Sequence, residues 1–277
     1  MVGFLGLTAV PILASLYFAF TDYDLFDAPQ WIGLGNFVEL FDDPRFLTSV
    51  RTTAVYVAAV VPLKLGASLG VALLLARRRR GSGLYRAAFY LPSLIGASVS
   101  LAIVWKALFS DGGAVDTVQR WFGVDVGGWA GNPSLATLML VLLAVWQFGA
   151  PMVIFLAGLL QVPRELYEAA DIDGAGPWQR FIGITLPSLS PVLLFNLVLE
   201  TIAAFQVFAS AFIVSNGLGG PAGATNVYTL YLYQQAFGNL RMGYASAMAW
   251  IMLVTVALVT LAIFRSARNW VHYEDAA

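Results

Sequence analysis

The sequence predicts an all-α protein, a bundle of six membrane-spanning helices that forms a single domain over residues 1–277. Composition carries this prediction, because hydrophobic residues make up 59% of the chain and charged residues only 11%. Soluble domains carry about 25% charged residues. The mean hydropathy is +0.77, and several apolar runs reach the length of about 20 residues that a helix needs to cross a bilayer. These observations exclude a water-soluble fold.

Six apolar segments are expected to form the spans, and hydropathy sets their approximate limits. They are residues 2–20, 50–76, 87–109, 135–160, 188–214 and 244–264. The first segment has no basic region before it and no small-residue cleavage site after it, so it is interpreted as a retained helix and not as a signal peptide. An even number of spans puts both termini on the same side of the membrane.

Arginine positions set the expected orientation, because loops rich in Lys and Arg tend to remain in the cytoplasm. The loops after the second and fourth segments, together with the residues after the sixth, carry Arg77, Arg78, Arg79, Arg80, Arg86, Arg164, Arg180, Arg265 and Arg268. The opposite loops are richer in Asp and Glu. Both termini are therefore expected in the cytoplasm. The run of four arginines is interpreted as a topology anchor, with lipid or partner binding as the alternative.

One polar stretch, ELYEAADIDGAGPWQRFIGITLP at residues 165–187, separates the fourth and fifth segments. Pro163 suits the first position of a helix, where its missing N–H costs nothing. The spacing predicts a helix over residues 163–173, which Gly174 and Gly176 are expected to end, and a second helix over residues 177–187. The result would be a short helix, a sharp turn and a second helix directly outside the bilayer.

The first of these helices is expected to present a small, smooth face with charges beside it. The residues of this face follow the spacing i, i+3, i+4 and i+7, and they are Leu166, Ala169, Ala170 and Asp173. Glu168 and Asp171 flank the face with charge. A rigid element with an apolar tip and a polar rim suits docking to another protein. An amphipathic loop that packs only on its own helices is the alternative.

The same stretch contains a complete EAA-loop pattern. Glu168-Ala169-Ala170 is followed after three residues by Gly174, and after nine more by Ile184, any residue, and Leu186-Pro187. With this pattern between two predicted spans, the chain resembles the permease subunits of binding-protein-dependent ABC importers. The segments GLGNFVELFDDPRF, FYLPSLIGASVSLAIVWKALF and GGPAGATNVYTLYLYQQAF look like the carbohydrate-uptake branch, and within it like the maltose-transporter type.

The resemblance implies a type I importer permease fold in a bacterial cytoplasmic (inner) membrane. Residues 161–187 would form the coupling loop that inserts into a separate ATPase subunit. Carried over to this sequence, the residues at that joint and on its second arm would be Glu168, Ala169, Ala170, Asp173, Gly174, Ile184, Leu186 and Pro187. The implied partners are a second homologous permease, two ATPase subunits that bind ATP and Mg²⁺, an extracytoplasmic substrate-binding protein, membrane lipid and a carbohydrate or polyol.

Several function classes have no support in the sequence. It has no G-x-x-x-x-G-K-[ST] loop for ATP, so an ATPase partner is required and no cofactor is expected on this chain. One histidine and no cysteine argue against a metal site, and a net charge of −1 gives no indication of nucleic-acid binding. A membrane-embedded enzyme would need a clustered catalytic set, and none is visible. An ion-coupled secondary transporter of a small polar solute is the alternative function.

Polar residues within the apolar segments are candidates for the substrate path, because such residues usually face the interior of a bundle. The candidates are Trp146, Gln147, Asn196, Glu200 and Gln206. An aromatic ring and amides suit the apolar face and the hydroxyls of a sugar. For Glu200, a hydrogen bond between helices or a contact to the sister subunit remains open. The two lysines, Lys64 and Lys106, are expected to snorkel towards the ends of their spans.

Overall fold

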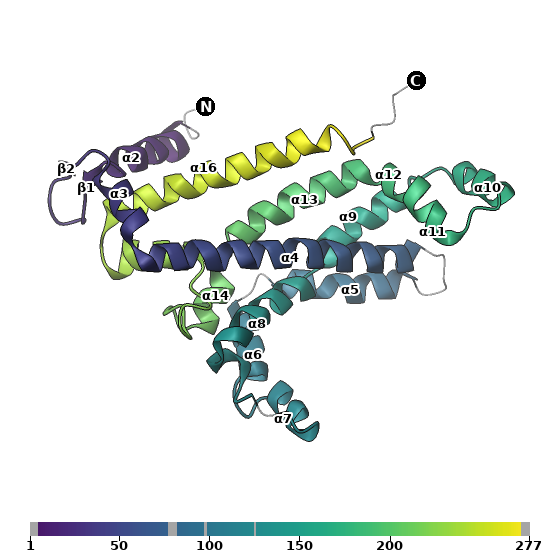
Figure 1. The fold of residues 1–277 in the computed structure, drawn as a ribbon, viewed down its shortest axis with the longest axis horizontal. Helices are drawn as coiled ribbons and strands as arrows, with labels where there is room; N and C mark the ends of the chain where they lie inside the picture. The colour runs from purple at the N-terminus through teal and green to yellow at the C-terminus, as the bar shows by residue number, and fades with distance from the viewer. Residues whose placement is uncertain (1–4, 77–81, 97–98, 125, 273–277) are drawn as a thin grey trace. The chain divides into compact units, whose positions relative to one another are not determined.

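The computed structural model describes residues 5–76, 82–96, 99–124 and 126–272, and this part of the chain is mostly helical with almost no sheet (Figure 1). The only described strands, β1 (Thr21–Asp22) and β2 (Gln30–Trp31), pair antiparallel with Thr21 opposite Trp31. The all-α prediction is therefore confirmed. The four consecutive arginines fall in residues 77–81, outside the described residues, so their interpretation as an anchor stays a prediction.

The helical elements follow one another along the whole chain. In chain order they are η1 (Leu5–Ala9), α2 (Val10–Phe18), α3 (Gly35–Asp42), α4 (Pro44–Ala76), α5 (Ser82–Gly96), α6 (Val99–Phe109), α7 (Ala114–Trp121), η2 (Trp129–Gly131), α8 (Pro133–Trp146), α9 (Gly149–Leu159), α10 (Arg164–Ile172), α11 (Pro177–Arg180), η3 (Phe181–Thr185), α12 (Leu186–Ser188), α13 (Ser190–Phe205), α14 (Ala209–Val214), α15 (Tyr228–Tyr233), η4 (Gln234–Gly238) and α16 (Met242–Ala267). The elements η1, η3 and η4 are π-helical, and η2 is a 3₁₀-helix.

Three described helices are long and apolar enough to cross a membrane: Pro44–Ala76, Ser190–Val214 and Met242–Ala267. Two pairs of shorter helices also qualify if each pair is counted as one span, which gives up to five. The first apolar segment forms only a shorter helix, Gly6–Phe18. The described residues thus contain three to five candidate spans where the sequence predicts six, and the count of six stays a prediction.

The chain divides into two compact units. The first consists of Met1–Tyr56, Ala102–Leu140 and Phe205–Leu258, and the second of Val57–Leu101, Val141–Ala204 and Val259–Ala277. Each unit combines segments that are far apart in the sequence. The predicted coupling loop and most of the candidate path residues belong to the second unit.

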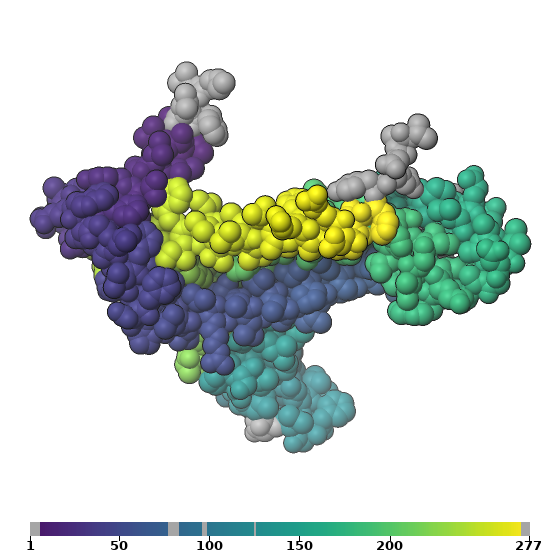
Figure 2. Space-filling view, turned by 45° about the horizontal axis from the view of Figure 1, so that its top comes forward, coloured from purple at the N-terminus to yellow at the C-terminus, as the bar shows by residue number. Residues whose placement is uncertain are grey.

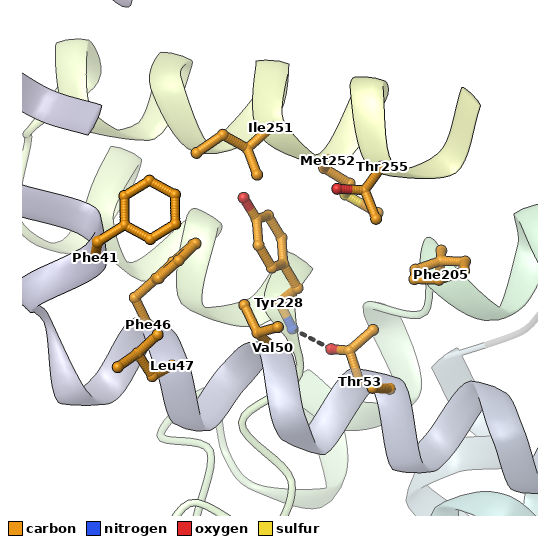
Figure 3. A pocket seen from close by; sticks show the side chains of 11 residues that line it. Phe41, Phe46, Leu47, Val50, Thr53, Phe205, Tyr228, Ile251, Met252 and Thr255 are labelled. Atoms are coloured by element: carbon orange, nitrogen blue, oxygen red, sulfur yellow. Dashed lines mark hydrogen bonds between the residues drawn. The ribbon is translucent and has the colours of Figure 1, made fainter. Parts of the chain in front are cut away.

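An apolar core holds the first unit together. Tyr228 is buried there, and its hydroxyl donates to the carbonyl of Met248 at 2.7 Å while its backbone N–H donates to the Thr53 hydroxyl at 2.8 Å. Beside this ring lies a cavity of about 320 Å³, lined almost wholly by apolar side chains that include Phe46 and Ile251 (Figure 3). The bonds of Tyr228 thus tie α4 and α16 to α15.

A carboxylate outside the candidate spans is held by two phenols in the first unit. Asp43, between α3 and α4, accepts hydrogen bonds from the hydroxyls of Tyr231 at 2.5 Å and Tyr244 at 2.7 Å. Burial raises the pKa of Asp43, but these donors, together with the backbone N–H groups of Arg45 and Phe46, outweigh burial and hold the pKa below its ordinary value of 3.8. Burial and the neighbouring carboxylate raise the pKa of Tyr231 to about 12.

In the second unit, α5 and α9 approach each other closely where α8 and α9 meet. A Cβ atom at Gly149 would lie 2.6 Å from the Ser93 hydroxyl oxygen and 2.7 Å from the carbonyl oxygen of Phe89, so only glycine fits there. At the break between them, α8 and α9 are bent by 42° relative to each other. The Ser93 hydroxyl donates to the carbonyl of Gln147 at 3.2 Å and accepts from the N–H of Ala150 at 3.0 Å. A side chain of α5 thus satisfies backbone groups that the break leaves free.

Candidate coupling loop and intramembrane polar sites

The first helix of the predicted loop, α10, begins at Arg164 and ends at Ile172. Pro163 is the N-cap, with φ −59° and ψ 132°, so the prediction that it occupies the first helical position is wrong by one residue. The backbone of Pro163 is extended and not helical, as is typical of the N-cap residue that precedes the first turn of a helix. Glu165 lies in the first turn, where its charge is favourable at the positive end of the helix.

Gly174 ends α10 through a Schellman motif. Its φ is +74°, in the left-handed region that favours glycine. The N–H of Ala175 donates to the carbonyl of Ala170 at 2.9 Å, and the N–H of Gly174 donates to the carbonyl of Asp171 at 3.2 Å. These two bonds satisfy carbonyls at the end of the helix. The predicted stop at Gly174 is therefore observed together with its cause.

The second helix begins at Pro177, as the sequence predicts, but it is not a uniform α-helix. It consists of α11, the π-helix η3 and α12, and it leads to α13 at Ser190. The Gln179 side chain accepts the N–H of Gly176 at 2.7 Å and so caps the start of α11. Ile184, Leu186 and Pro187 are half-buried here. Pro187 also lines a cavity of about 380 Å³ with Gln161 and His272.

Two polar contacts join α10 to the second helix of the loop, and a third joins that helix to the turn between them. The hydroxyls of Tyr167 and Thr185 lie 2.9 Å apart, and Thr185 is buried. The Arg180 guanidinium forms an ion pair with Asp171 and donates to the carbonyl of Ala175 at 2.7 Å. Asp171 therefore serves inside the loop and is not only part of a charged rim. The loop is therefore braced by its own side chains.

The outer surface of this braced loop is open. Figure 2 shows α10 and α11 as a rounded knob at one end of the second unit. Glu168, Ala169 and Asp173 are exposed on it, whereas Ala170 is half-buried. Ile172 is 88% exposed and Trp178 is 70% exposed, so large apolar side chains are exposed to solvent beside the predicted small face. Exposed apolar groups with a charged rim are the expected composition of a protein-binding surface.

Glu200 forms an ion pair that the sequence analysis did not predict. Its carboxylate lies 2.8 Å from the ammonium of Lys64, and both side chains are mostly buried, with 13% and 15% exposed. The expectation that Lys64 snorkels is therefore wrong: a mid-helix ammonium is satisfied more cheaply by a nearby carboxylate than by extension to a distant interface. Lys106, in the last turn of α6, instead donates to the carbonyl of Ile213 at 3.1 Å and to Asn216 at 2.7 Å.

The other candidate path residues do not share one position. Asn196 is buried one turn from Glu200 and donates to the carbonyl of Val192 at 3.2 Å. Trp146 and Gln147 lie at the break between α8 and α9, and the Gln147 amide donates to the carbonyl of Leu143 at 3.2 Å. Gln206 is exposed in the break between α13 and α14, after α13 has ended at Phe205.

Sequence reasoning did not single out Ser93, Ile172 or Trp178. A serine in an apolar helix does not reveal which group it bonds. The backbone groups that Ser93 bonds lie in a helix break that is distant in sequence. Ile172 and Trp178 do carry a signal, since large apolar residues in a polar loop next to a membrane suggest a contact surface.

Among the described residues, no group of three or more His, Asp and Glu side chains is arranged to hold a metal ion.

Known proteins resemble this chain in sequence and in fold. The chain is 50% identical to "Probable ABC transporter permease protein YesP" of Bacillus subtilis (strain 168), over 99% of this chain and 90% of the relative. It is 33% identical to "Lactose transport system permease protein LacF" of Rhizobium radiobacter, over 87% and 82% of the two chains. Its fold is similar to a subunit of a bacterial alginate ABC transporter in complex with an alginate-bound periplasmic protein, with a TM-score of 0.83, 21% identity, and coverage of 97% and 91%.

The family described as "Binding-protein-dependent transport system inner membrane component" matches residues 64–271, which contain the entire loop and the Lys64–Glu200 ion pair. The relatives named above are transporter permeases and not enzymes. The chain belongs to the family of binding-protein-dependent transport system inner membrane components, and it is a membrane-integral permease subunit of an ABC transporter.

Proposed function

We propose that this chain is a permease subunit of an ATP-driven importer that forms the translocation path for a sugar or a related polyol. Two observations support the substrate class. The relative from Rhizobium radiobacter, 33% identical, is named for lactose transport. The outer and third-span segments quoted above also resemble the carbohydrate-uptake branch over most of the chain.

The coupling loop at residues 161–187 docks on a separate ATPase subunit that binds ATP and Mg²⁺. The observation that carries this proposal is the braced, exposed knob of α10 and α11, in which the Tyr167–Thr185 contact and the Asp171–Arg180 ion pair fix the loop. A preformed element loses little conformational entropy on docking and transmits displacement without deforming. The residues assigned to the joint and its second arm are Glu168, Ala169, Ala170, Asp173, Gly174, Ile184, Leu186 and Pro187.

The complete importer would contain a second homologous permease, two ATPase subunits and an extracytoplasmic binding protein. This chain would cross the membrane six times with both termini in the cytoplasm. The excess of arginine in the loops on one side supports this orientation. ATP binding would shift an existing equilibrium between inward-facing and outward-facing states.

The path through the membrane would involve Trp146, Gln147, Asn196, Glu200 and Gln206 to different degrees. The ion pair with Lys64 gives Glu200 a structural role between helices, so a direct role in binding solute rests mainly on Trp146 and Gln147 at the helix break. The same ion pair disfavours an ion-coupled secondary transporter, because the carboxylate already has a fixed counter-charge.

Reconstitution of the complete complex in proteoliposomes tests the proposal. The binding protein would be screened against neutral oligosaccharides, uronic-acid oligosaccharides and polyol phosphates, and the tightest ligand would be used for uptake. We expect ligand-loaded binding protein to stimulate ATP hydrolysis and uptake together. Ala169→Arg should abolish both, whereas Leu160→Ala, an exposed position outside the EAA pattern, should retain them. Uptake without an ATPase, or normal coupling in Ala169→Arg, would refute the proposal.

A further inference from the structure

Two side chains of α4 lie one turn apart and bond to two different segments. The ammonium of Lys64 lies 2.8 Å from the Glu200 carboxylate of α13. The hydroxyl of Ser68, which is fully buried, lies 3.0 Å from the carbonyl oxygen of Phe148 at the break between α8 and α9. Residues four apart share one face of a helix. The same hydroxyl lies 2.6 Å from the carbonyl oxygen of Lys64, so its single proton is shared between that carbonyl and the carbonyl of Phe148.

These two segments are the two arms of the coupling loop. α9 starts directly after Phe148 and leads into the loop, and α13 starts directly after α12, where the loop ends (Figure 1). Lys64, Ser68, Phe148 and Glu200 all belong to the second unit, which also contains the loop. One face of α4 is thus bonded to the helix before the loop and to the helix after it.

We propose that Lys64 and Ser68 form a junction that makes α4 follow both arms of the coupling loop, with Lys64 and Glu200 as positioning residues for transport. This inference rests on the proposed function of the loop. Movement that enters at α10 would pass along α9 and α13, which are stiff helices, and reach α4 at two neighbouring points. Without the junction, α4 would lose these two polar links to the arms.

The chemistry of the pair suits this role better than a purely stabilising one. A buried ion pair is often no more stable than a well-packed apolar pair of the same volume, and charges within a membrane are costly. An ion pair is specific in position, however: a slip of one helical turn, about 5.4 Å, would break it, whereas apolar side chains find new partners. The pair therefore fixes the register of α4 against α13.

The test measures distances between nitroxide labels in the assembled complex. The chain has no cysteine, so pairs of introduced cysteines can be labelled specifically when the other subunits are cysteine-free. A label at Leu63 reports α4, a label at Leu160 reports the arm before the loop, and a label at Ile182 reports the arm after it. All three side chains are about half exposed. Distances would be compared without nucleotide and with MgATP plus vanadate.

In the otherwise wild-type chain, we expect both the Leu63–Ile182 and the Leu63–Leu160 distances to stay unchanged between the two states. Glu200→Gln and Lys64→Met should broaden the Leu63–Ile182 distribution and shift it by up to one helical turn, about 5.4 Å, while leaving Leu63–Leu160 nearly unchanged. Ser68→Ala should do the reverse. The exchange Lys64→Glu with Glu200→Lys should restore the narrow distribution.

A control and two results decide the outcome. Leu199→Ala, next to Glu200 on the exposed side of α13, should leave both distributions unchanged. Equal broadening of both distances in every variant would mean general loosening and would overturn the junction. Distributions like those of the wild type in Glu200→Gln, Lys64→Met and Ser68→Ala would overturn it as well. A third pair, Ile182 with Val118 of the first unit, reports switching itself: if its distance does not respond to MgATP plus vanadate, the proposed function fails instead.

Discussion

The hydroxyl oxygens of Tyr167 and Thr185 lie 2.9 Å apart and join the first helix of the loop to the helical arm that leads into α13. This contact links an exposed helix to a buried position, because Thr185 is 5% exposed. The ion pair of Asp171 with Arg180 repeats the link on the same arm. These internal contacts brace the loop, as its proposed coupling role requires.

Tyr167→Phe should loosen α10 without unfolding the chain. It removes one hydrogen bond of a partly buried pair, which is worth about 1 kcal/mol. Hydrogen exchange of the α10 amides should become faster, by up to about fivefold for that free energy. Tyr85→Phe, at an exposed position on α5, is the matched control. Unchanged protection of α10 in Tyr167→Phe would mean that the bond does not hold the helix.

Gly174→Ala should weaken docking through backbone strain alone. A Cβ atom at Gly174 meets nothing within 4 Å, but the φ of +74° is unfavourable for alanine. The expected cost is about 1–2 kcal/mol, and Gly174→Asn should cost less because asparagine tolerates this region. The measurement is the affinity of the purified ATPase for the permease in nanodiscs.

Gly183→Ala is the control for Gly174, since its Cβ would also meet nothing within 4 Å and its φ is ordinary. It should bind the ATPase as the wild type does. If Gly174→Ala and Gly174→Asn bind equally well and as tightly as Gly183→Ala, the left-handed turn is not needed for docking.

Gly149→Ala should destabilise the second unit by overpacking. The added Cβ would lie 2.6 Å from the Ser93 hydroxyl oxygen and 2.7 Å from a backbone carbonyl of α5, so the helices would have to separate. Such changes cost about 1–3 kcal/mol. Thermal unfolding in detergent should show a lower midpoint than for Gly83→Ala, where the added Cβ meets nothing within 4 Å. Equal midpoints would contradict the close approach of α5 and α9.

The Asp43 cluster should make stability depend on pH in the acid range. The pKa of Asp43 is lower in the folded state than its ordinary value of 3.8, so its stabilising contribution is complete above that value and is lost as the pH falls through the lower folded pKa. Tyr231→Phe removes one donor, and we expect a loss of about 1 kcal/mol at neutral pH. That deficit should shrink in strong acid, where the carboxylate is protonated.

The measurement is the difference in unfolding midpoint between wild type and Tyr231→Phe as a function of pH. Tyr17→Phe, an exposed phenol of the same unit, should show no such dependence. A deficit for Tyr231→Phe that stays constant even in strong acid, where the carboxylate of Asp43 is protonated, would mean that the carboxylate charge does not stabilise the cluster.

The sequence predicts where a helix starts or ends when the residues that cause it lie at that point of the chain. The stop of α10 at Gly174 and the start of the second helix at Pro177 follow from the backbone preferences of glycine and proline. The bounds of α10 differ from the prediction by one residue at each end. The exposure of the large side chains of Ile172 and Trp178 was not predicted, because neither residue belongs to the EAA pattern.

Long-range pairings were not predictable in the same way. Lys64 and Glu200 are separated by about half of the chain, and hydropathy places each in a span without fixing how the spans rotate about their axes. The breaks at Gln147 and Gln206 were missed for a related reason: apolar runs continue through them, and the free backbone groups are satisfied by side chains such as Ser93 that only tertiary contact brings there. Hydrophobic periodicity describes the faces of a single helix, and it does not show which other helix packs on each face.

Docking of the coupling loop, residues 161–187, on the ATPase is tested most directly by cross-linking. A single cysteine introduced as Ala169→Cys, in a chain that has none, would be treated with a thiol-to-amine cross-linker in the assembled complex. We expect an ATPase adduct at Ala169→Cys and none at Leu199→Cys on α13. An adduct at neither position, or at both equally, would contradict the account.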